Sequence, residues 1–157
     1  VAKSKSGIMV RGISDVAVRF PRCCNPVPGD EIVGFVTRGK GMTIHRTDCV
    51  NMLHLSDTER ERLIEVEWGE TPENESGGQY LAELKIFTDD RQGLLMEITR
   101  IFTEGKLDVK SMNVRTSKKG TATFDMGFIV HGREELEKVI EKVRQIDGVI
   151  DIERTAG

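Results

Sequence analysis

Aromatic residues and long apolar runs are both scarce in this chain. Aromatic residues make up 5% of its 157 residues, with one tryptophan and one tyrosine. No stretch approaches the roughly 20 consecutive apolar residues that a membrane-spanning helix needs, and the opening residues 1–7 lack the apolar core of a secretory signal peptide. We therefore expect small domains with modest cores, in the cytoplasm and outside any membrane. Because the chain begins with Val1 and not with methionine, we expect a piece of a longer protein.

Cysteine is also scarce: the chain has three, Cys23, Cys24 and Cys49. An odd number with two adjacent residues is a poor framework for disulfides. Reduced thiols in a cytoplasmic protein are the better interpretation, because disulfides are rare in that compartment.

The net charge of −3 hides an uneven distribution. Residues 1–55 contain eight Lys and Arg against four Asp and Glu, a net charge of +4, whereas residues 56–78 contain two against eight. The positive excess therefore lies in the segment that holds the cysteines. A basic surface suits a polyanionic partner such as RNA, and ordinary solvated charge is the alternative.

The sequence predicts two domains joined by a linker. Residues 71–78 are polar and end in two glycines, which is typical of a linker. The preceding segment, 1–70, has short strand patterns at 8–20, 32–36, 42–45 and 63–68. Residues 47–60 suit a short helix. We predict a small β-rich domain over 1–70, and a domain of that size often needs an additional cross-link to be stable.

Residues 79–157 carry a regular alternation of strand and helix patterns. Alternating apolar residues predict strands at 80–87, 107–115, 122–130 and 149–153. Apolar stripes predict two helices, one capped by Asp89 or Asp90 and ended by Gly105, and one running from Arg133 to Gly148. The order βαββαβ predicts a ferredoxin-like sandwich, so the overall fold class is α+β.

Cysteine and histidine residues in the first domain form a possible metal site. Cys23, Cys24, His45 and Cys49 together supply three sulfurs and one nitrogen, a complete donor set for tetrahedral zinc. A structural zinc would also be the cross-link that a small domain needs, because metal binding is coupled to folding.

The spacing of these residues leaves other interpretations open. Adjacent cysteines on a strand point to opposite faces, so both can be ligands only in a turn, which Asn25-Pro26 would provide. Alternatively the cysteines are small buried hydrophobic residues and His45 is a hydrogen-bonded surface residue. Catalytic Cys–His chemistry is a third interpretation, and it lacks an evident orienting partner for His45.

The second domain offers one possible ligand loop. Backbone N–H groups at a helix N-terminus attract anions, and Gly93 would let a ligand approach the backbone closely. Plain helix capping by Asp89 or Asp90 is the alternative. Base stacking on the sheet is not expected, because Phe124 and Phe128 share a uniformly apolar face and belong to the core.

Several strings resemble one family closely. These are Cys-Cys-Asn-Pro-Val-Pro-Gly-Asp over 23–30, Thr-Arg-Gly-Lys-Gly over 37–41 and His-Arg-Thr-Asp-Cys over 45–49. They resemble the C-terminal region of long RelA/SpoT homologues, the (p)ppGpp synthetase/hydrolase enzymes of the bacterial stringent response. Asp-Arg-Gln-Gly-Leu over 90–94 is similar to the Asp-Arg-x-Gly-Leu pattern of the ACT domain that ends those proteins.

The resemblance implies a regulatory fragment without catalytic activity, because the hydrolase and synthetase domains lie upstream in the family. It assigns zinc to the four Cys and His residues above. It also implies contact between the zinc-finger-like domain and ribosomal RNA in a stalled ribosome that holds uncharged tRNA. The expected phosphate contacts are Arg38, Lys40 and Arg46.

The ACT resemblance implies edge-to-edge dimers with an amino acid, suggested to be branched-chain, bound at the interface. The matching pocket positions are Asp90, Gly93, Leu94, Asp108 and Val109. Related ACT domains often have Asn where this chain has Asp90 and Asp108, and the two carboxylates would favour the ligand's ammonium group. The alternatives are a ligand-free module for dimerisation or autoinhibition, and a thiol enzyme.

Overall fold

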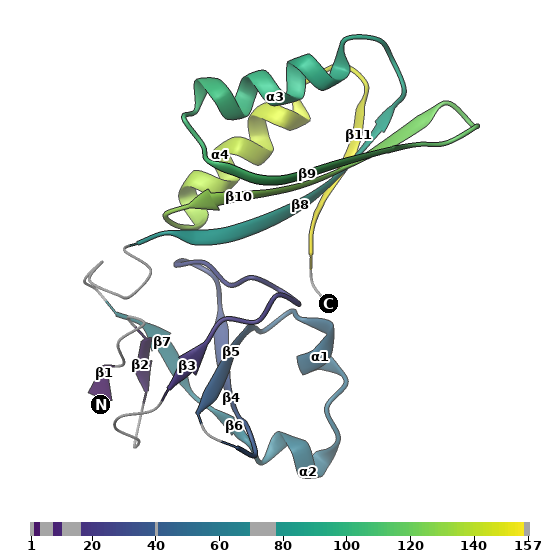
Figure 1. Ribbon diagram of the computed structural model, residues 1–157. Helices are drawn as coiled ribbons and strands as arrows, with labels where there is room; N and C mark the ends of the chain where they lie inside the picture. Colours follow the sequence, from purple (N-terminus) through teal and green to yellow (C-terminus); the bar gives the residue numbers. More distant parts are fainter. Residues whose placement is uncertain (1, 4–7, 11–16, 40, 70–77, 156–157) are drawn as a thin grey trace. The chain divides into compact units, whose positions relative to one another are not determined.

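A computed structural model describes residues 2–3, 8–10, 17–39, 41–69 and 78–155 of the chain. The described residues fall into two compact units, one ending at Tyr80 and the other running from Leu81 to Thr155 (Figure 1). Of the linker predicted for 71–78, only Gly78 lies in the described part. No helix among these residues is long and apolar enough to cross a membrane.

The first unit contains two small sheets and two short helices. One sheet has the strand order β1 (Ala2–Lys3), β2 (Ile8–Val10), β7 (Val66–Trp68). The other has the order β3 (Val18–Arg19), β5 (Met42–Arg46), β4 (Ile32–Val36), β6 (Leu63–Ile64). Between β5 and β6 lie the helices α1 (Val50–Leu53) and α2 (Asp57–Arg60).

Most of the predicted elements of this unit are present. β4 and β5 form the predicted antiparallel hairpin, and α1 and α2 lie within the segment 47–60. The single strand predicted over 63–68 is wrong, because the chain changes sheets at Glu65: β6 pairs with β4, whereas β7 pairs with β2. Of the pattern at 8–20, residues 11–16 lie outside the described residues.

Glycine at position 34 lets the core of the first unit close. Ile8, Met42, Ile44 and Val66 form a buried cluster. A Cβ atom at Gly34 would collide with the Met42 sulfur, so the absence of a side chain there admits Met42 to the core. A second buried cluster contains Cys24, Cys49 and Met52.

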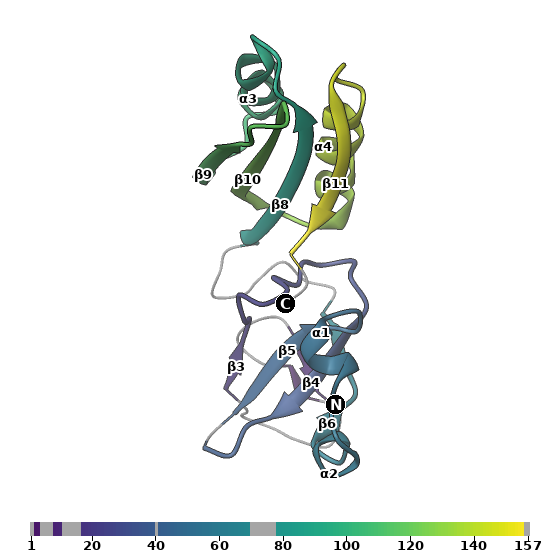
Figure 2. The same ribbon diagram turned by 90° about the vertical axis from the view of Figure 1, so that its right-hand side faces the viewer.

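The second unit has the predicted βαββαβ order. Its elements are β8 (Tyr80–Asp89), α3 (Leu94–Glu104), β9 (Val109–Thr116), β10 (Thr121–Val130), α4 (Arg133–Arg144) and β11 (Val149–Arg154). The sheet order is β11-β8-β10-β9, and both helices cover the same face of the sheet (Figure 2). The ferredoxin-like fold is therefore confirmed.

The core of this unit lies between the sheet and the helices. Phe124 and Phe128 are 3% and 0% exposed, so they are core residues as predicted. The rings of Phe102 on α3 and Phe128 on β10 meet edge to face, with centroids 4.9 Å apart, a favourable arrangement for aromatic pairs.

The predicted capping of α3 by Asp89 or Asp90 is wrong. The N-cap residue is Gly93, with φ of 85°, and no side chain caps the helix. Asp89 instead ends β8, and its N–H donates to the Gly148 carbonyl, while the Asp90 N–H donates to the Gly120 carbonyl. The loop is thus held by backbone bonds to two neighbouring turns.

Candidate metal centre

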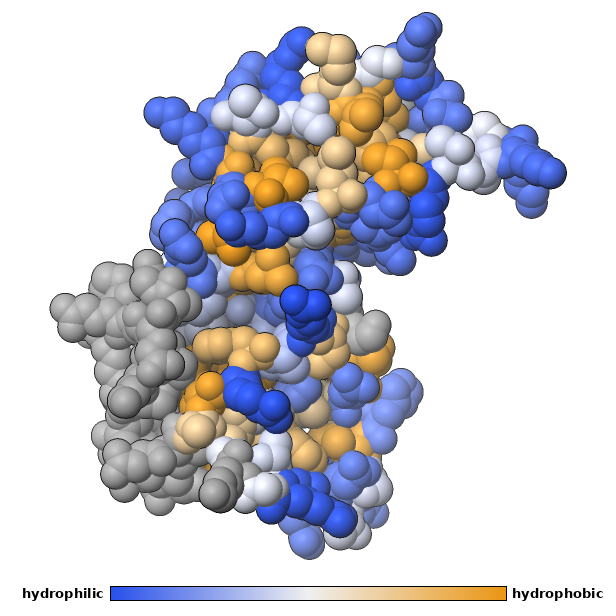
Figure 3. Space-filling model, in the orientation of Figure 1, coloured by the Kyte–Doolittle hydropathy of each residue, from blue (hydrophilic) through white to orange (hydrophobic). Residues whose placement is uncertain are grey.

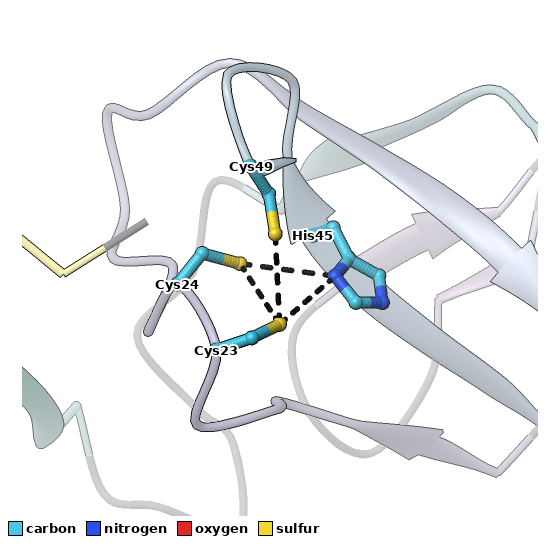
Figure 4. Close-up of side chains that lie close together, drawn as sticks. All are labelled: Cys23, Cys24, His45 and Cys49. Atoms are coloured by element: carbon cyan, nitrogen blue, oxygen red, sulfur yellow. Dashed lines mark hydrogen bonds between the residues drawn. The ribbon is translucent and has the colours of Figure 1, made fainter. Parts of the chain in front are cut away.

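Three separate segments bring the four Cys and His side chains together (Figure 4). Cys23 and Cys24 lie in the turn that follows β3, His45 lies on β5, and Cys49 is the N-cap residue of α1. Cys24 and Cys49 are fully buried and His45 is 7% exposed. The residues singled out as a zinc site in the sequence therefore form one cluster.

A left-handed residue allows both adjacent cysteines to face the same point. Asn25 has φ of 46°, a conformation that asparagine tolerates better than most residues. Its N–H donates to the Pro21 carbonyl at 3.2 Å and closes a tight turn around the cysteine pair. In an extended strand, Cys23 and Cys24 would point to opposite faces, so this turn makes the cluster possible.

The distances within the cluster fit a tetrahedral donor set. His45 Nδ1 lies 3.4 Å from Cys23 Sγ and 3.8 Å from Cys24 Sγ. Cys23 Sγ lies 3.6 Å from Cys49 Sγ and 3.9 Å from Cys24 Sγ. All four donor atoms lie within 4.8 Å of one another. Zinc with bonds of about 2.3 Å to sulfur and about 2.0 Å to nitrogen separates its ligand atoms by about 3.5–3.8 Å, so the cluster has the right size for zinc.

The other ring nitrogen of His45 has an orienting partner. His45 Nε2 lies 3.0 Å from Thr43 Oγ1, and the Thr43 hydroxyl donates in turn to the Phe35 carbonyl at 3.5 Å. If Nδ1 binds a metal, Nε2 carries the proton and donates to Thr43, as metal-bound histidines usually do toward a nearby oxygen. The sequence predicted no orienting partner for His45. Thr43 was nevertheless a detectable candidate, because residues 43 and 45 of one strand have their side chains on the same face.

Burial determines the protonation states of the cluster in the absence of a cation. Burial raises the pKa of the Cys24 and Cys49 thiols above their ordinary value of 9.0 and lowers the pKa of His45 below 6.5. Without a cation these donors are neutral, and a divalent ion would displace the thiol protons. A reactive thiol needs a lowered pKa, so these shifts oppose the thiol-enzyme alternative.

The residues predicted to contact RNA differ in their exposure to solvent. Arg38 is exposed in the turn after β4, and Lys40 is outside the described residues. Arg46 is only 5% exposed, and its guanidinium forms two hydrogen bonds with the Asp48 carboxylate. The burial of Arg46 argues against a phosphate contact, whereas Arg19 and Arg22 are exposed beside the cysteine turn.

The residues predicted to bind an amino acid do not meet within one copy of the second unit. Asp90 and Gly93 are exposed at the end of the sheet that carries the β9–β10 turn, and Leu94 is buried. Asp108 and Val109 lie at the opposite end, where the Asp108 carbonyl accepts a hydrogen bond from the Ile129 N–H. The eight residues of β9 separate the two ends, which corresponds to about 26 Å.

A groove of about 320 Å³ lies between α3 and β9. Its lining includes Thr99, Phe102, Leu107, Val109 and Met112. Val109 is thus the one predicted ligand residue that lines this groove. Figure 3 shows hydrophobic side chains gathered over this part of the second unit.

Two domain families match the chain: the RelA/SpoT RIS domain over residues 8–69 and the ACT domain over residues 76–154. The chain belongs to the RelA/SpoT family. It is 40% identical over 153 residues to the GTP pyrophosphokinase of Streptomyces coelicolor, covering 98% of this chain and 18% of that protein. It is 36% identical over 157 residues to the GTP pyrophosphokinase of Escherichia coli K12, covering 99% of this chain and 21% of that protein.

This RelA/SpoT chain spans about a fifth of the length of the curated relatives it matches. It corresponds to the regulatory C-terminal region of RelA/SpoT-type GTP pyrophosphokinases, and the prediction of a non-catalytic segment is confirmed by the RIS and ACT matches. The second unit is also similar to the crystal structure of the ACT domain from GTP pyrophosphokinase of Chlorobium tepidum, at 24% identity and a TM-score of 0.45, covering 48% of this chain and 97% of that chain.

Proposed function

We propose that this chain regulates the catalytic domains of a cytoplasmic (p)ppGpp synthetase/hydrolase in the stringent response. Its RIS unit acts as a zinc-stabilised domain that binds ribosomal RNA, next to tRNA on the ribosome, and its ACT unit senses an amino acid. The observation that supports the zinc is the cluster of four donor atoms within 4.8 Å of one another. Cys23, Cys24, His45 and Cys49 would hold the ion.

Zinc would supply structural cross-linking and no reaction chemistry, because a site with four protein ligands has no open position for a substrate. The cross-link would join the cysteine turn, β5 and the start of α1. These three segments also share a small buried cluster around Cys24, Cys49 and Met52. A small cluster of this kind gives a domain little stability by itself.

Elemental analysis of the purified chain tests the zinc. We expect about one zinc per chain in the wild type and none in Cys49→Ser. The matched control is His54→Ala, because His54 is an exposed histidine that does not belong to the cluster. Equal metal content in Cys49→Ser and the wild type would contradict the assignment.

RNA binding would use exposed arginines of the RIS unit. Arg22 immediately precedes Cys23 in the cysteine turn, Arg19 ends β3, and Arg38 lies in the turn between β4 and β5. Because the zinc would fix the cysteine turn, it would also fix Arg22. RNA affinity is therefore expected to fall when the zinc is removed.

A mobility-shift assay with ribosomal RNA tests this part. Arg22→Gln together with Arg38→Gln is expected to weaken binding and to reduce the slope of log affinity against log salt by about one for each lost phosphate contact. Arg133→Gln is the control, since Arg133 is an exposed arginine on α4 of the other unit. An unchanged slope in the double variant would contradict the assignment.

Amino-acid sensing would require two copies of the chain. β9 is an edge strand whose eight residues are all exposed, and unpaired edges favour the addition of another strand. Antiparallel pairing of β9 with β9 of a second copy brings the Asp108 end of one copy to the Asp90 end of the other. The apolar groove beside Val109 lies at the Asp108 end and suits a branched aliphatic side chain.

Calorimetry with valine, isoleucine and leucine, with glycine as control, tests the sensing. Heat is expected for at least one branched ligand at millimolar concentration, and sedimentation is expected to give a dimer. Val114→Lys on β9 is expected to abolish both. The absence of heat with all three ligands would remove the sensing role.

A ligand-free module for dimerisation or autoinhibition is the second candidate. The ion pair of Asp108 with Lys110, at 2.8 Å, favours it, because this carboxylate already has a cationic partner. A dimer by sedimentation that gives no heat with amino acids would support this candidate.

A further inference from the structure

Arg46 is a buried cation next to the candidate metal centre. Its side chain is 6% exposed, whereas the side chain of its partner Asp48 is 68% exposed. Arg46 Nε and Nη2 donate to the two Asp48 carboxylate oxygens at 2.8 and 2.9 Å. This bidentate arrangement fixes the plane of the guanidinium.

The same residue makes two bonds to Cys24. Arg46 Nη1 donates to the Cys24 carbonyl at 3.0 Å, and the Arg46 backbone N–H donates to Cys24 Sγ at 3.4 Å. The side-chain bond holds the backbone of the cysteine turn, whereas the bond to the sulfur comes from the main chain and does not depend on the side chain at position 46. Arg46 thus connects the cysteine turn to the His45–Cys49 segment without being a metal ligand.

The charges of the site give Arg46 a second role. Three thiolates and a neutral imidazole around a divalent ion carry a net charge of −1, and Cys24 and Cys49 are fully buried. A buried negative charge is costly unless a positive charge lies close to it. The Arg46 guanidinium is buried and lies within hydrogen-bond distance of the Cys24 carbonyl, whereas its Asp48 partner is largely exposed, so a positive charge lies beside one of the ligand residues.

We propose that Arg46 is a positioning residue of the metal centre: it holds Cys24 in place and balances the charge of the thiolate-rich site. This inference rests on the zinc site proposed above. It differs from a general structural role in its consequence for the metal. A residue that only stabilises the fold lowers the melting temperature equally with and without metal, whereas a positioning residue reduces the rise in melting temperature that the metal produces.

Cobalt titration of the full chain tests the proposal, with Co²⁺ alone as the probe. Arg46→Lys keeps the charge but loses the bidentate fork, and Co²⁺ affinity is expected to fall roughly 10- to 100-fold, the range found for residues that orient metal ligands. The metal-induced rise in melting temperature is expected to shrink as well. Arg91→Lys is the matched control, because Arg91 in the ACT unit also bonds a main-chain carbonyl, that of Asp147, and a carboxylate, that of Glu97.

Asp48→Asn is the second variant, in case Arg46→Lys does not fold. Asp48 is exposed, so Asp48→Asn weakens the paired hydrogen bonds to the Arg46 guanidinium without leaving a cavity. The Co²⁺ affinity is therefore expected to lie between those of the wild type and Arg46→Lys. Wild-type affinity and an unchanged cobalt spectrum in both variants would overturn the role of Arg46 alone. A wild-type chain without the thiolate-to-cobalt absorption would overturn the metal site itself, and this inference with it.

Discussion

The Nδ1 atom of His45 lies 3.4 Å from the sulfur of Cys23, although 22 residues separate them in the chain. This contact joins β5 to the turn that follows β3, and the contact of Cys23 with Cys49 extends it to the start of α1. The candidate metal centre therefore lies where three segments of the RIS unit converge. The first prediction concerns what the ion contributes to holding them.

Removal of zinc is expected to destabilise the RIS unit. With free zinc at 100 times the dissociation constant, binding to the folded state adds about 2.7 kcal/mol to the free energy of unfolding. Cys49→Ser is expected to lose this contribution. Trp68 is the single tryptophan of the chain and packs against the buried cluster of this unit, so its fluorescence during urea unfolding measures the change.

His54→Ala is the control for this experiment, since it removes an exposed imidazole. Addition of a chelator is expected to shift the midpoint of the wild type and of His54→Ala, and to leave Cys49→Ser unchanged. A chelator effect of the same size in Cys49→Ser would refute the prediction.

The pH dependence of the metal-free protein is the second prediction. Burial lowers the pKa of His45 below 6.5, so the unfolded state binds a proton first as the pH falls, and stability declines below about pH 6.5. Burial raises the pKa of Cys24 and Cys49 above 9.0, so the unfolded state loses protons first as the pH rises, and stability declines above about pH 9.0. The maximum is expected between these values.

Zinc is expected to change this profile. The folded state then holds thiolates, so folding releases protons and stability rises with pH across the range in which the unfolded thiols remain protonated. Urea unfolding at a series of pH values, with and without zinc, measures both curves. Parallel curves would show that the thiols do not exchange protons for the metal.

Much of the ACT unit is predictable because local pattern and tertiary packing agree there. The alternation of Ala122, Phe124, Met126, Phe128 and Val130 places one face of β10 in the core, and all five are buried. The cap of α3 was not predictable in this way. Aspartate is a residue type that often caps helices, but neither Asp89 nor Asp90 caps α3. Their N–H groups are instead bound by turns far away in the sequence.

The donor set of the candidate metal centre was predictable from residue types, and its geometry was not. Convergence of Cys23 and Cys24 depends on the positive φ of Asn25, which few residues other than glycine adopt and which spacing does not reveal. An arginine in a basic segment is normally exposed. Arg46 is buried where its guanidinium donates to the Cys24 carbonyl, and this contact between distant residues forms only when the chain folds.

Thr43→Val is the third prediction. The substitution keeps the shape of the side chain but removes the oxygen that lies 3.0 Å from His45 Nε2. The imidazole then loses the partner that fixes its orientation, and zinc affinity is expected to fall about 10-fold. Chelator competition measures the affinity. Thr37→Val, which removes another half-buried hydroxyl of the same unit, is the control and is expected to retain the wild-type affinity.

The fourth prediction tests the close contact between Gly34 and Met42 in the core of the RIS unit. The new Cβ atom of Gly34→Ala would collide with the Met42 sulfur and lie 3.1 Å from Val66 Cγ1. Overpacking of this kind costs about 1–3 kcal/mol, and Met42→Ala alone leaves a cavity that costs about 2–5 kcal/mol.

The two changes together are expected to cost less than the sum of the two, because the added methyl group occupies part of the space that Met42 vacates. Trp68 packs against the same cluster, so its fluorescence during urea unfolding measures all three variants. Neighbouring residues that share a cavity usually deviate from additivity by 0.5 kcal/mol or more, an order-of-magnitude figure. Additive effects would mean that Gly34 is required for a reason other than the space taken by Met42.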